Sequence, residues 1–177
     1  MEIRPANLVD LNACLAIDDS FDTDYVYQME ERNTPGDIAV TFHLARLPRP
    51  MKVPHIISRD QLALDFQHLI PGTILVADDG VVRGFIDVVE SEWNQLAYIN
   101  NFAIAPAYRR KGTGSQLMRA AIEWARQKKL RAIMVDTSTK DYPAICFYQK
   151  FGFVFCGFND QIYPNRDIAM IYSLQLR

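Results

Sequence analysis

The stretch Arg109-Arg110-Lys111-Gly112-Thr113-Gly114 lies between an apolar segment that ends near Ala105 and an amphipathic segment that begins near Thr113. Two glycines one residue apart let the backbone approach a bulky anion without a Cβ in the way. The first turn of a helix leaves amide N–H groups unpaired, and the helix dipole favours negative charge there. Three cationic residues, Arg109, Arg110 and Lys111, come directly before the first glycine. The stretch therefore predicts a strand–loop–helix unit that holds a phosphate or pyrophosphate.

The glycine spacing excludes two common nucleotide-binding loops. The Walker loop needs four residues between its glycines, and the dinucleotide fingerprint needs a third glycine where Leu117 stands. On this spacing alone, a plain loop-to-helix joint with exposed basic residues is an equal alternative.

The pattern Arg-x-x-Gly-x-Gly over 109–114 resembles the pyrophosphate loop of the GNAT superfamily of N-acetyltransferases, which grips acetyl-coenzyme A. A second motif agrees with it. The run Pro143–Phe153, which contains Tyr148-Gln149-Lys150-Phe151-Gly152-Phe153, is similar to the superfamily's helix ending in Tyr-x-Lys-x-Gly-Phe. The match covers roughly Thr73–Leu176. Within the superfamily the chain is most similar to the streptothricin acetyltransferases, through Gly84, Trp93-Asn94, Leu96-Ala97, Ile99, Trp124-Ala125, Thr137, Thr139, Pro143-Ala144, Gly157 and Tyr163.

The resemblance implies an acetyl-CoA-dependent transfer of acetyl to a primary amine by direct attack, with no covalent enzyme intermediate. A small molecule such as a streptothricin-like antibiotic is the expected acceptor, which would make the chain an antibiotic-resistance enzyme. Two alternatives stay open: a ribosomal-protein-type N-terminal acetyltransferase, and a non-catalytic acyl-CoA sensor. The expected partners are acetyl-CoA and the amine, with a homodimer as a further possibility.

The resemblance also places the cofactor. Backbone N–H groups from Arg110 to Ser115 would hold the pyrophosphate, with charge added by Arg109. The strand Phe102–Ile104 would pair with the pantetheine arm and supply an oxyanion donor. The expected cofactor-binding residues are Phe102, Ala103, Ile104, Arg109, Arg110, Lys111, Gly112, Thr113, Gly114 and Ser115.

Two residues are expected to be catalytic. By resemblance, Tyr148 is a general acid or a hydrogen-bond donor to the departing thiolate; its alternative is a packed tyrosine whose hydroxyl meets a backbone carbonyl. Asp136, which ends a predicted strand, would orient the amine and accept its proton through water. Its alternative is a strand-end residue that caps the loop Thr137–Lys140.

Two positions depart from many members of the superfamily. Where many carry a glutamate as a water-linked base, this chain has Asn100 followed by Asn101. Neither amide can take a proton, so the base is Asp136, solvent, Asp87 or Glu90. Where many carry an asparagine that touches the cofactor, this chain has Asp141, whose charge would face an anionic ligand.

Hydrophobic periodicity predicts an α/β fold: antiparallel strands feeding a parallel pair, with helices on both faces of a mixed central sheet. By resemblance the parallel pair is splayed. Strands are expected near 1–4, 73–77, 81–89, 95–105, 132–137, 154–158 and 168–176, and helices near 7–17, 59–68 (capped by Ser58), 113–129 and from 143. The whole chain, 1–177, is expected to be a single domain.

The segment 21–54 is expected to form two extended stretches, 23–32 and 37–47, around the turn Thr34-Pro35-Gly36. Three prolines between 48 and 54 exclude a helix there. A hairpin or lid on the substrate side is the preferred interpretation, with a structural arm or a dimer contact as the alternative.

Composition excludes several other classes. A net charge of −2 offers no basic field for nucleic acid. The sequence contains no run of about eighteen apolar residues, so no membrane span is expected. Three cysteines, an odd number, indicate reduced thiols. A cytoplasmic location is therefore expected. The three histidines are scattered, so no metal site is expected. Since no histidine follows Cys146, that thiol is expected to be a buried packing residue rather than a nucleophile.

Overall fold

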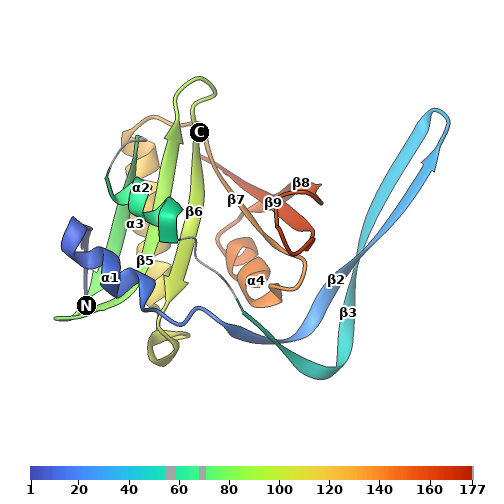
Figure 1. The fold of residues 1–177 in the computed structure, drawn as a ribbon. Coiled ribbons are helices and arrows are strands. Elements are labelled where there is room, and N and C mark those ends of the chain that lie inside the picture. The colour runs from blue at the N-terminus through green and yellow to red at the C-terminus, as the bar shows by residue number, and fades with distance from the viewer. Residues whose placement is uncertain (55–58, 68–70, 177) are drawn as a thin grey trace. The chain divides into compact units, whose positions relative to one another are not determined.

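The computed structural model describes residues 1–54, 59–67 and 71–176. The chain divides into two compact units, both visible in Figure 1. Unit 1 comprises Met1–Asp19, His55–Val135 and Ser173–Arg177, and unit 2 comprises Ser20–Pro54 and Asp136–Tyr172. The predicted helix cap Ser58 and the predicted helix end at His68 lie outside the described residues.

The sheet of unit 1 has the strand order β1-β4-β5-β6-β7. The strands are β1 (Glu2–Pro5), β4 (Gly72–Asp78), β5 (Val82–Ser91), β6 (Leu96–Ile104) and β7 (Ala132–Ser138), whose last residues enter unit 2. The pairs β1–β4, β4–β5 and β5–β6 are antiparallel, whereas β6–β7 is parallel. The middle residues of β4 and β5 are buried in succession, as expected of strands covered on both faces.

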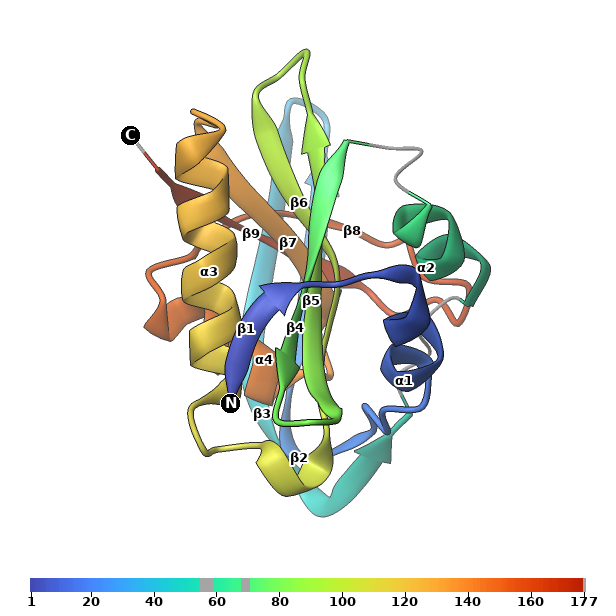
Figure 2. The same cartoon turned by 90° about the vertical axis from the view of Figure 1, so that its left-hand side faces the viewer.

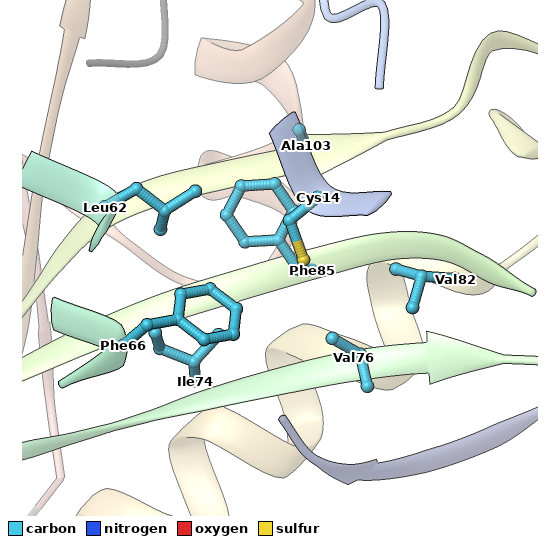
Figure 3. Close-up of a cluster of buried hydrophobic side chains, with 8 residues drawn as sticks. All are labelled: Cys14, Leu62, Phe66, Ile74, Val76, Val82, Phe85 and Ala103. Atoms are coloured by element: carbon cyan, nitrogen blue, oxygen red, sulfur yellow. The ribbon is translucent and has the colours of Figure 1, made fainter. Parts of the chain in front are cut away.

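Helices cover both faces of this sheet, as the sequence predicts (Figure 2). On one face lies α3 (Thr113–Gln127), whose apolar stripe is buried: Leu117, Met118, Ala121, Ile122 and Ala125. On the other face lie the short 3₁₀ turn η1 (Leu8–Asp10), α1 (Leu11–Leu15) and α2 (Arg59–Phe66). Beneath these helices is a hydrophobic core, shown in Figure 3, of Cys14, Leu62, Phe66, Ile74, Val76, Val82, Phe85 and Ala103.

The strand β6 changes its pairing part-way along. Its parallel register with β7 runs from Leu96–Ala132 to Ile99–Val135 and ends there, although β6 continues to Ile104. This confirms the predicted parallel pair, whose register ends part-way along β6. At the same level, the antiparallel register with β5 shifts, because Asp87 lies opposite Asn101 while Val88 lies opposite Ile99. Asn100 is therefore the extra residue of a β-bulge.

In unit 2, the segment 21–54 forms the predicted hairpin. Its strands, β2 (Phe21–Thr34) and β3 (Asp37–Val53), pair antiparallel around a turn in which Gly36 has φ +85°. The second strand is longer than predicted and passes through Pro48 and Pro50. The register explains this: pairing jumps from Tyr25–Arg46 to Thr23–Met51, so the prolines fall in a bulge where no ladder hydrogen bond is lost.

The rest of unit 2 holds α4 (Tyr142–Lys150), β8 (Val154–Asn159) and the first residues of β9 (Ala169–Gln175), whose end from Ser173 belongs to unit 1. The strand order here is β7-β9-β8. Aromatic contacts and a backbone hydrogen bond attach the hairpin to this part of unit 2. The ring of Tyr25 lies 5.1 Å from that of Tyr142, and the Tyr27 N–H donates to the Thr139 carbonyl over 2.9 Å. The hairpin and the segment before α4 thus form one packed unit.

Two sequence predictions are wrong. Cys146 is exposed, because the buried positions of α4 are Ile145 and Tyr148 and the intervening residue falls off that stripe. The first predicted helix ends at Leu15 rather than Ile17, and begins with the 3₁₀ turn η1, which Asn7 caps.

Gly84 allows β5 and β6 to approach closely. A Cβ at this position would lie 2.6 Å from Ile104 Cδ1 and 2.9 Å from the Ala103 carbonyl oxygen. Gly84→Ala should therefore lower the free energy of unfolding by about 1–3 kcal/mol, measured by urea denaturation. Gly157→Ala is the control, because a Cβ there meets nothing within 4 Å. Equal effects of the two changes would contradict the close approach.

Candidate functional site

The loop between β6 and α3 contains the predicted anion site. A 3₁₀ turn, Pro106–Tyr108, leads to Arg109, and Gly112 stands at the N-cap of α3 with φ +91°. Arg110 also has a positive φ, of 61°. An added Cβ at Gly112 would meet nothing within 4 Å, so glycine is needed there for its conformation rather than for space.

The first turn of α3 is open to an anion. The first helical bond runs from the Gln116 N–H to the Gly112 carbonyl over 3.0 Å, so the amides of Thr113, Gly114 and Ser115 precede it. No side chain caps this end of the helix. Helix N-termini without a capping side chain leave N–H groups for a ligand or for water.

The basic residues of the loop have different surroundings. Arg109 Nε donates to the Ile104 carbonyl over 2.9 Å, and Arg109 Nη2 donates to the Asp18 carbonyl over 2.6 Å. Arg109 therefore braces the loop against β6 and the segment after α1. Arg110 and Lys111 are exposed, and Lys111 Nζ lies 5.9 Å from the centre of the Tyr108 ring.

Phe102, Ala103 and Ile104 lie on the part of β6 beyond its register with β7. They pair with Ile86, Phe85 and Gly84 of β5. A strand held on one side by a ladder presents alternate N–H and C=O groups on its other side. This is the geometry that an extended, amide-containing ligand requires for strand-like pairing.

Tyr148 lies in α4 of unit 2 and is 5% exposed. Its ring packs against Phe147 and Phe153, at centroid distances of 5.8 and 5.7 Å. Burial, with the negative charges of Asp141 and Asp136, raises the pKa of Tyr148 above its ordinary value. The hydroxyl therefore keeps its proton throughout the physiological range and can act as a hydrogen-bond donor.

Asp136 is held by a residue that sequence reasoning did not assign a role. The Tyr163 hydroxyl donates to Asp136 Oδ2 over 2.6 Å, a length typical of a charge-assisted hydrogen bond. Burial, then the charge of Asp136, raises the pKa of Tyr163. Tyr163 lies in the irregular segment between β8 and β9. Periodicity carries no signal in such a segment, so only the fold could bring the two residues together.

Asp141 has a structural role in unit 2. Its carboxylate caps α4, accepting a hydrogen bond from the Ala144 N–H over 3.0 Å. A carboxylate at a helix N-terminus is favoured by the helix dipole. Asp141 is thus the N-cap of the helix that carries Tyr148.

Unit 2 also contains an open hollow of about 310 Å³. The hairpin contributes Tyr27 and Phe42, and Gln149 of α4 contributes a polar group. The remaining lining residues are Val40, Thr41, Phe155, Met170 and Tyr172. The mixed aromatic and polar lining suits an amphipathic ligand. That 21–54 covers the substrate stays a prediction.

Neither of two further site types is found in the described residues. Within 1–54, 59–67 and 71–176, no three His, Cys, Asp or Glu side chains gather as metal ligands would. No helix in that part of the chain has the length and apolar character needed to cross a membrane.

Comparison with known proteins adds the family. The model of the acetyltransferase (GNAT) family matches residues 38–153. A streptothricin acetyltransferase of Streptomyces lavendulae is 30% identical over 169 residues, which are 92% of this chain and 86% of that relative. The chain belongs to the GNAT acetyltransferase family. The resemblance stated from the two sequence motifs is thereby confirmed, and it extends beyond the segment that they span.

Solved structures share the fold of this acetyltransferase. A nourseothricin acetyltransferase superposes with a TM-score of 0.82 at 26% identity, over 99% of this chain and 98% of that one. A putative streptothricin acetyltransferase from Bacillus anthracis, solved in complex with acetyl coenzyme A, gives a TM-score of 0.77 at 23% identity, over 98% of both chains. The predicted fold class is confirmed.

The capping role of Asp141 can be measured apart from any activity. Asp141→Ala should lower the free energy of unfolding by about 1 kcal/mol, because the Ala144 N–H loses its acceptor. Asp141→Asn should retain most of the stability, since its amide oxygen can still accept. Urea denaturation measures both, with the exposed Asp160→Ala as control. A loss in the asparagine variant equal to that in the alanine variant would show that charge, rather than capping, is what matters.

Proposed function

We propose that this acetyltransferase transfers the acetyl group of acetyl-CoA to a primary amine of a small molecule of the streptothricin type. The observation that carries the proposal is the extent of the similarity to the Streptomyces lavendulae enzyme. It covers 92% of this chain. About 8% of the chain lies outside the similarity. This part contains fewer residues than the 21–54 hairpin of unit 2, so the similarity must include part of that hairpin. A fold shared with many acetyltransferases would not require likeness there, because loops outside the core vary most between related proteins.

The donor is assigned to unit 1. In the proposal the amides of Thr113, Gly114 and Ser115 hold the pyrophosphate, while exposed Arg110 and Lys111 add positive charge. Arg109 acts through the loop, because its guanidinium already donates to two carbonyls. The pantetheine amides pair with β6 over Phe102–Ile104. A backbone N–H beside the bulge donates to the acetyl carbonyl as it becomes an oxyanion.

Proton removal from the amine is assigned to Asp136. The neutral amine attacks the thioester carbon, a C–N bond forms and the C–S bond breaks, with no acyl-enzyme between. A lysine-like amine is neutral at pH 8 at a cost of about 3 kcal/mol, so no strong base is required. Asp136, oriented by the Tyr163 hydroxyl, accepts the proton through water.

Tyr148 stabilises the leaving thiolate. Because its pKa is raised, Tyr148 does not give up its proton readily to a thiolate, whose conjugate acid titrates near about 8.5. Its role in the proposal is therefore hydrogen-bond donation as charge develops on sulfur, and solvent later supplies the proton. This refines the choice between general acid and hydrogen-bond donor.

The proposal is tested by thiol release from acetyl-CoA with a panel of amines: streptothricin, spermidine, lysine and a short peptide with an N-terminal alanine. Release should be fastest with streptothricin, and mass spectrometry should find one acetyl group on the product. Preferential acetylation of the peptide would overturn the small-molecule assignment in favour of an N-terminal acetyltransferase. Tight binding of acetyl-CoA with no release in any arm would favour the acyl-CoA sensor.

Gly114→Glu should abolish acetyl-CoA binding. The new side chain brings bulk and negative charge to the first turn of α3, where the pyrophosphate is proposed to lie. Titration calorimetry measures the affinity, and circular dichroism checks the fold. Gln116→Glu, at an exposed position two residues further along α3, is the matched control for charge. Unchanged affinity in Gly114→Glu would remove the pyrophosphate from this loop.

Tyr148→Phe should lower kcat by about 10²-fold, with a smaller effect on KM for acetyl-CoA, because the lost hydrogen bond forms as charge develops on sulfur. The buried ring contacts are retained, so stability should change little. Steady-state kinetics and thermal denaturation measure the two effects. A kcat within about threefold of the wild type would reduce Tyr148 to a packing residue.

A further inference from the structure

Unit 1 contains two carboxyl groups in its interior that the proposed chemistry does not use. Asp87 of β5 is 1% exposed and Asp65 of α2 is 5% exposed. Asp87 follows Phe85 by two residues, so it lies on the face of β5 that packs beneath α1 and α2 (Figure 3). Buried carboxylates are stable only when paired and hydrogen-bonded, so the surroundings of both groups require an explanation.

The hydrogen bonds around the two groups leave one oxygen without a donor. Asn101 Nδ2 donates to Asp87 Oδ2 over 2.8 Å, and Gln61 Nε2 donates to Asp65 Oδ1 over 3.0 Å. In the described part of the chain, no N–H or O–H group donates to the buried Asp65 Oδ2. Besides Gln61, the Asp87 side chain lies within hydrogen-bonding contact of Asp65. Two carboxyl groups can hydrogen-bond only when one proton lies between them.

Among the described residues that face Asp87, none is a cation, so a proton is what offsets its negative charge. From β6 it meets the neutral Asn101, and from β4 the apolar Ile74 lies opposite it. From α1 comes Cys14, whose pKa burial raises to about 12, so the thiol is neutral. Burial first, and then Asp65 of α2, raises the pKa of Asp87 to about 7, against the opposing effect of the Asn101 hydrogen bond. Asp87 therefore keeps a proton that an exposed aspartate would have lost.

The pair is connected to the strand that is proposed to hold the acetyl group. Asp87 lies directly opposite Asn101, and the preceding residue of β6, Asn100, is the bulged one. A bulge redirects the backbone groups beside it, and its geometry depends on the residues that flank it. The hydrogen bond from Asn101 to Asp87 fixes one flank.

We infer that Asp65 and Asp87 share one proton and act as positioning residues, holding Asn101 and hence the β-bulge at Asn100 in the geometry that aims a backbone amide at the acetyl carbonyl. The inference rests on the proposed function for the role of the bulge. The shared proton itself does not depend on that function, because it follows from the burial of both groups, the contact between them and the Asp65 oxygen to which no described group donates.

Asp65→Asn and Asp65→Ala separate this role from simple packing. In Asp65→Asn, the amide nitrogen can donate to Asp87 in place of the shared proton, while the amide oxygen still accepts from Gln61. Its kcat at pH 7 should stay within about twofold of the wild type. Asp65→Ala leaves Asp87 without that partner, so kcat should fall about tenfold, with KM for acetyl-CoA changed less than about twofold, because a misaimed oxyanion donor acts on the transition state. Asp60→Asn, an exposed change on the same helix, is the control.

The pH dependence of stability gives a readout independent of turnover. Asp87 titrates near 3.8 when unfolded and near 7 when folded, so its stabilising effect is fully present below about pH 4 and is lost as the pH rises to about 7. An amide at position 65 keeps a donor to Asp87 at every pH. Asp65→Asn should therefore have a higher Tm than the wild type at pH 8 and no such advantage at pH 4.

Each outcome bears on one claim. If kcat per folded molecule is unchanged in Asp65→Ala, the positioning role is overturned. If Asp65→Asn shows the same pH dependence of Tm as the wild type, the shared proton is overturned. If the wild-type enzyme releases no thiol with any amine, the proposed function is overturned instead. The Tm comparison would still test the shared proton.

Discussion

The antiparallel pairing of β5 with β6 is the interaction on which the rest of unit 1 depends. Gly84 permits the strands to approach where Ala103 and Ile104 lie, and Asp87 pairs with Asn101 beside the bulge. Further along β6, the parallel pairing with β7 ends at Ile99, and the chain then continues into the glycine loop. Because a ladder transmits register over its whole length, a local shift in this pairing would displace both the bulge and the loop.

In unit 2, two tyrosines lie close to negative charge: Tyr148, which is buried, and Tyr163, which is half-buried. Tyr148 and Tyr163 both have raised pKa values, and Asp136 contributes to each. Protonated phenols beside a carboxylate are hydrogen-bond donors rather than bases. Donors of this kind stabilise charge that develops during a reaction without themselves changing charge, which suits the departure of a thiolate.

The two units divide the proposed chemistry by the kind of group each provides. Unit 1 contributes backbone: amides of a helix terminus and of a bulged strand. Unit 2 contributes side chains, chiefly hydroxyl and carboxyl groups. Backbone amides are insensitive to substitution as long as the fold persists, whereas side chains can be exchanged singly. The two sequence motifs reflect this difference. The glycine motif preserves a backbone conformation, whereas the tyrosine motif preserves a functional group.

Local signals in the sequence were sufficient for the α/β class, for the glycine loop and for the family. Each depends on neighbouring residues: apolar periodicity in α3, the two glycines before it, and the Tyr-x-Lys-x-Gly-Phe ending of α4. The exposure of Cys146 was missed because nine residues of helix give too short a stripe to fix which face is buried.

Only the tertiary structure decided which distant groups meet. Tyr163 reaches Asp136 across 27 positions of sequence, and Asp65 meets Asp87 from a different element. The proline-rich end of β3 was likewise unpredictable, because the bulge that tolerates it is defined by register with β2. Sequence patterns record what each segment buries, and that is a local property. Contacts between polar groups from separate segments depend on how the segments pack against each other. The periodicity within either segment does not encode that packing.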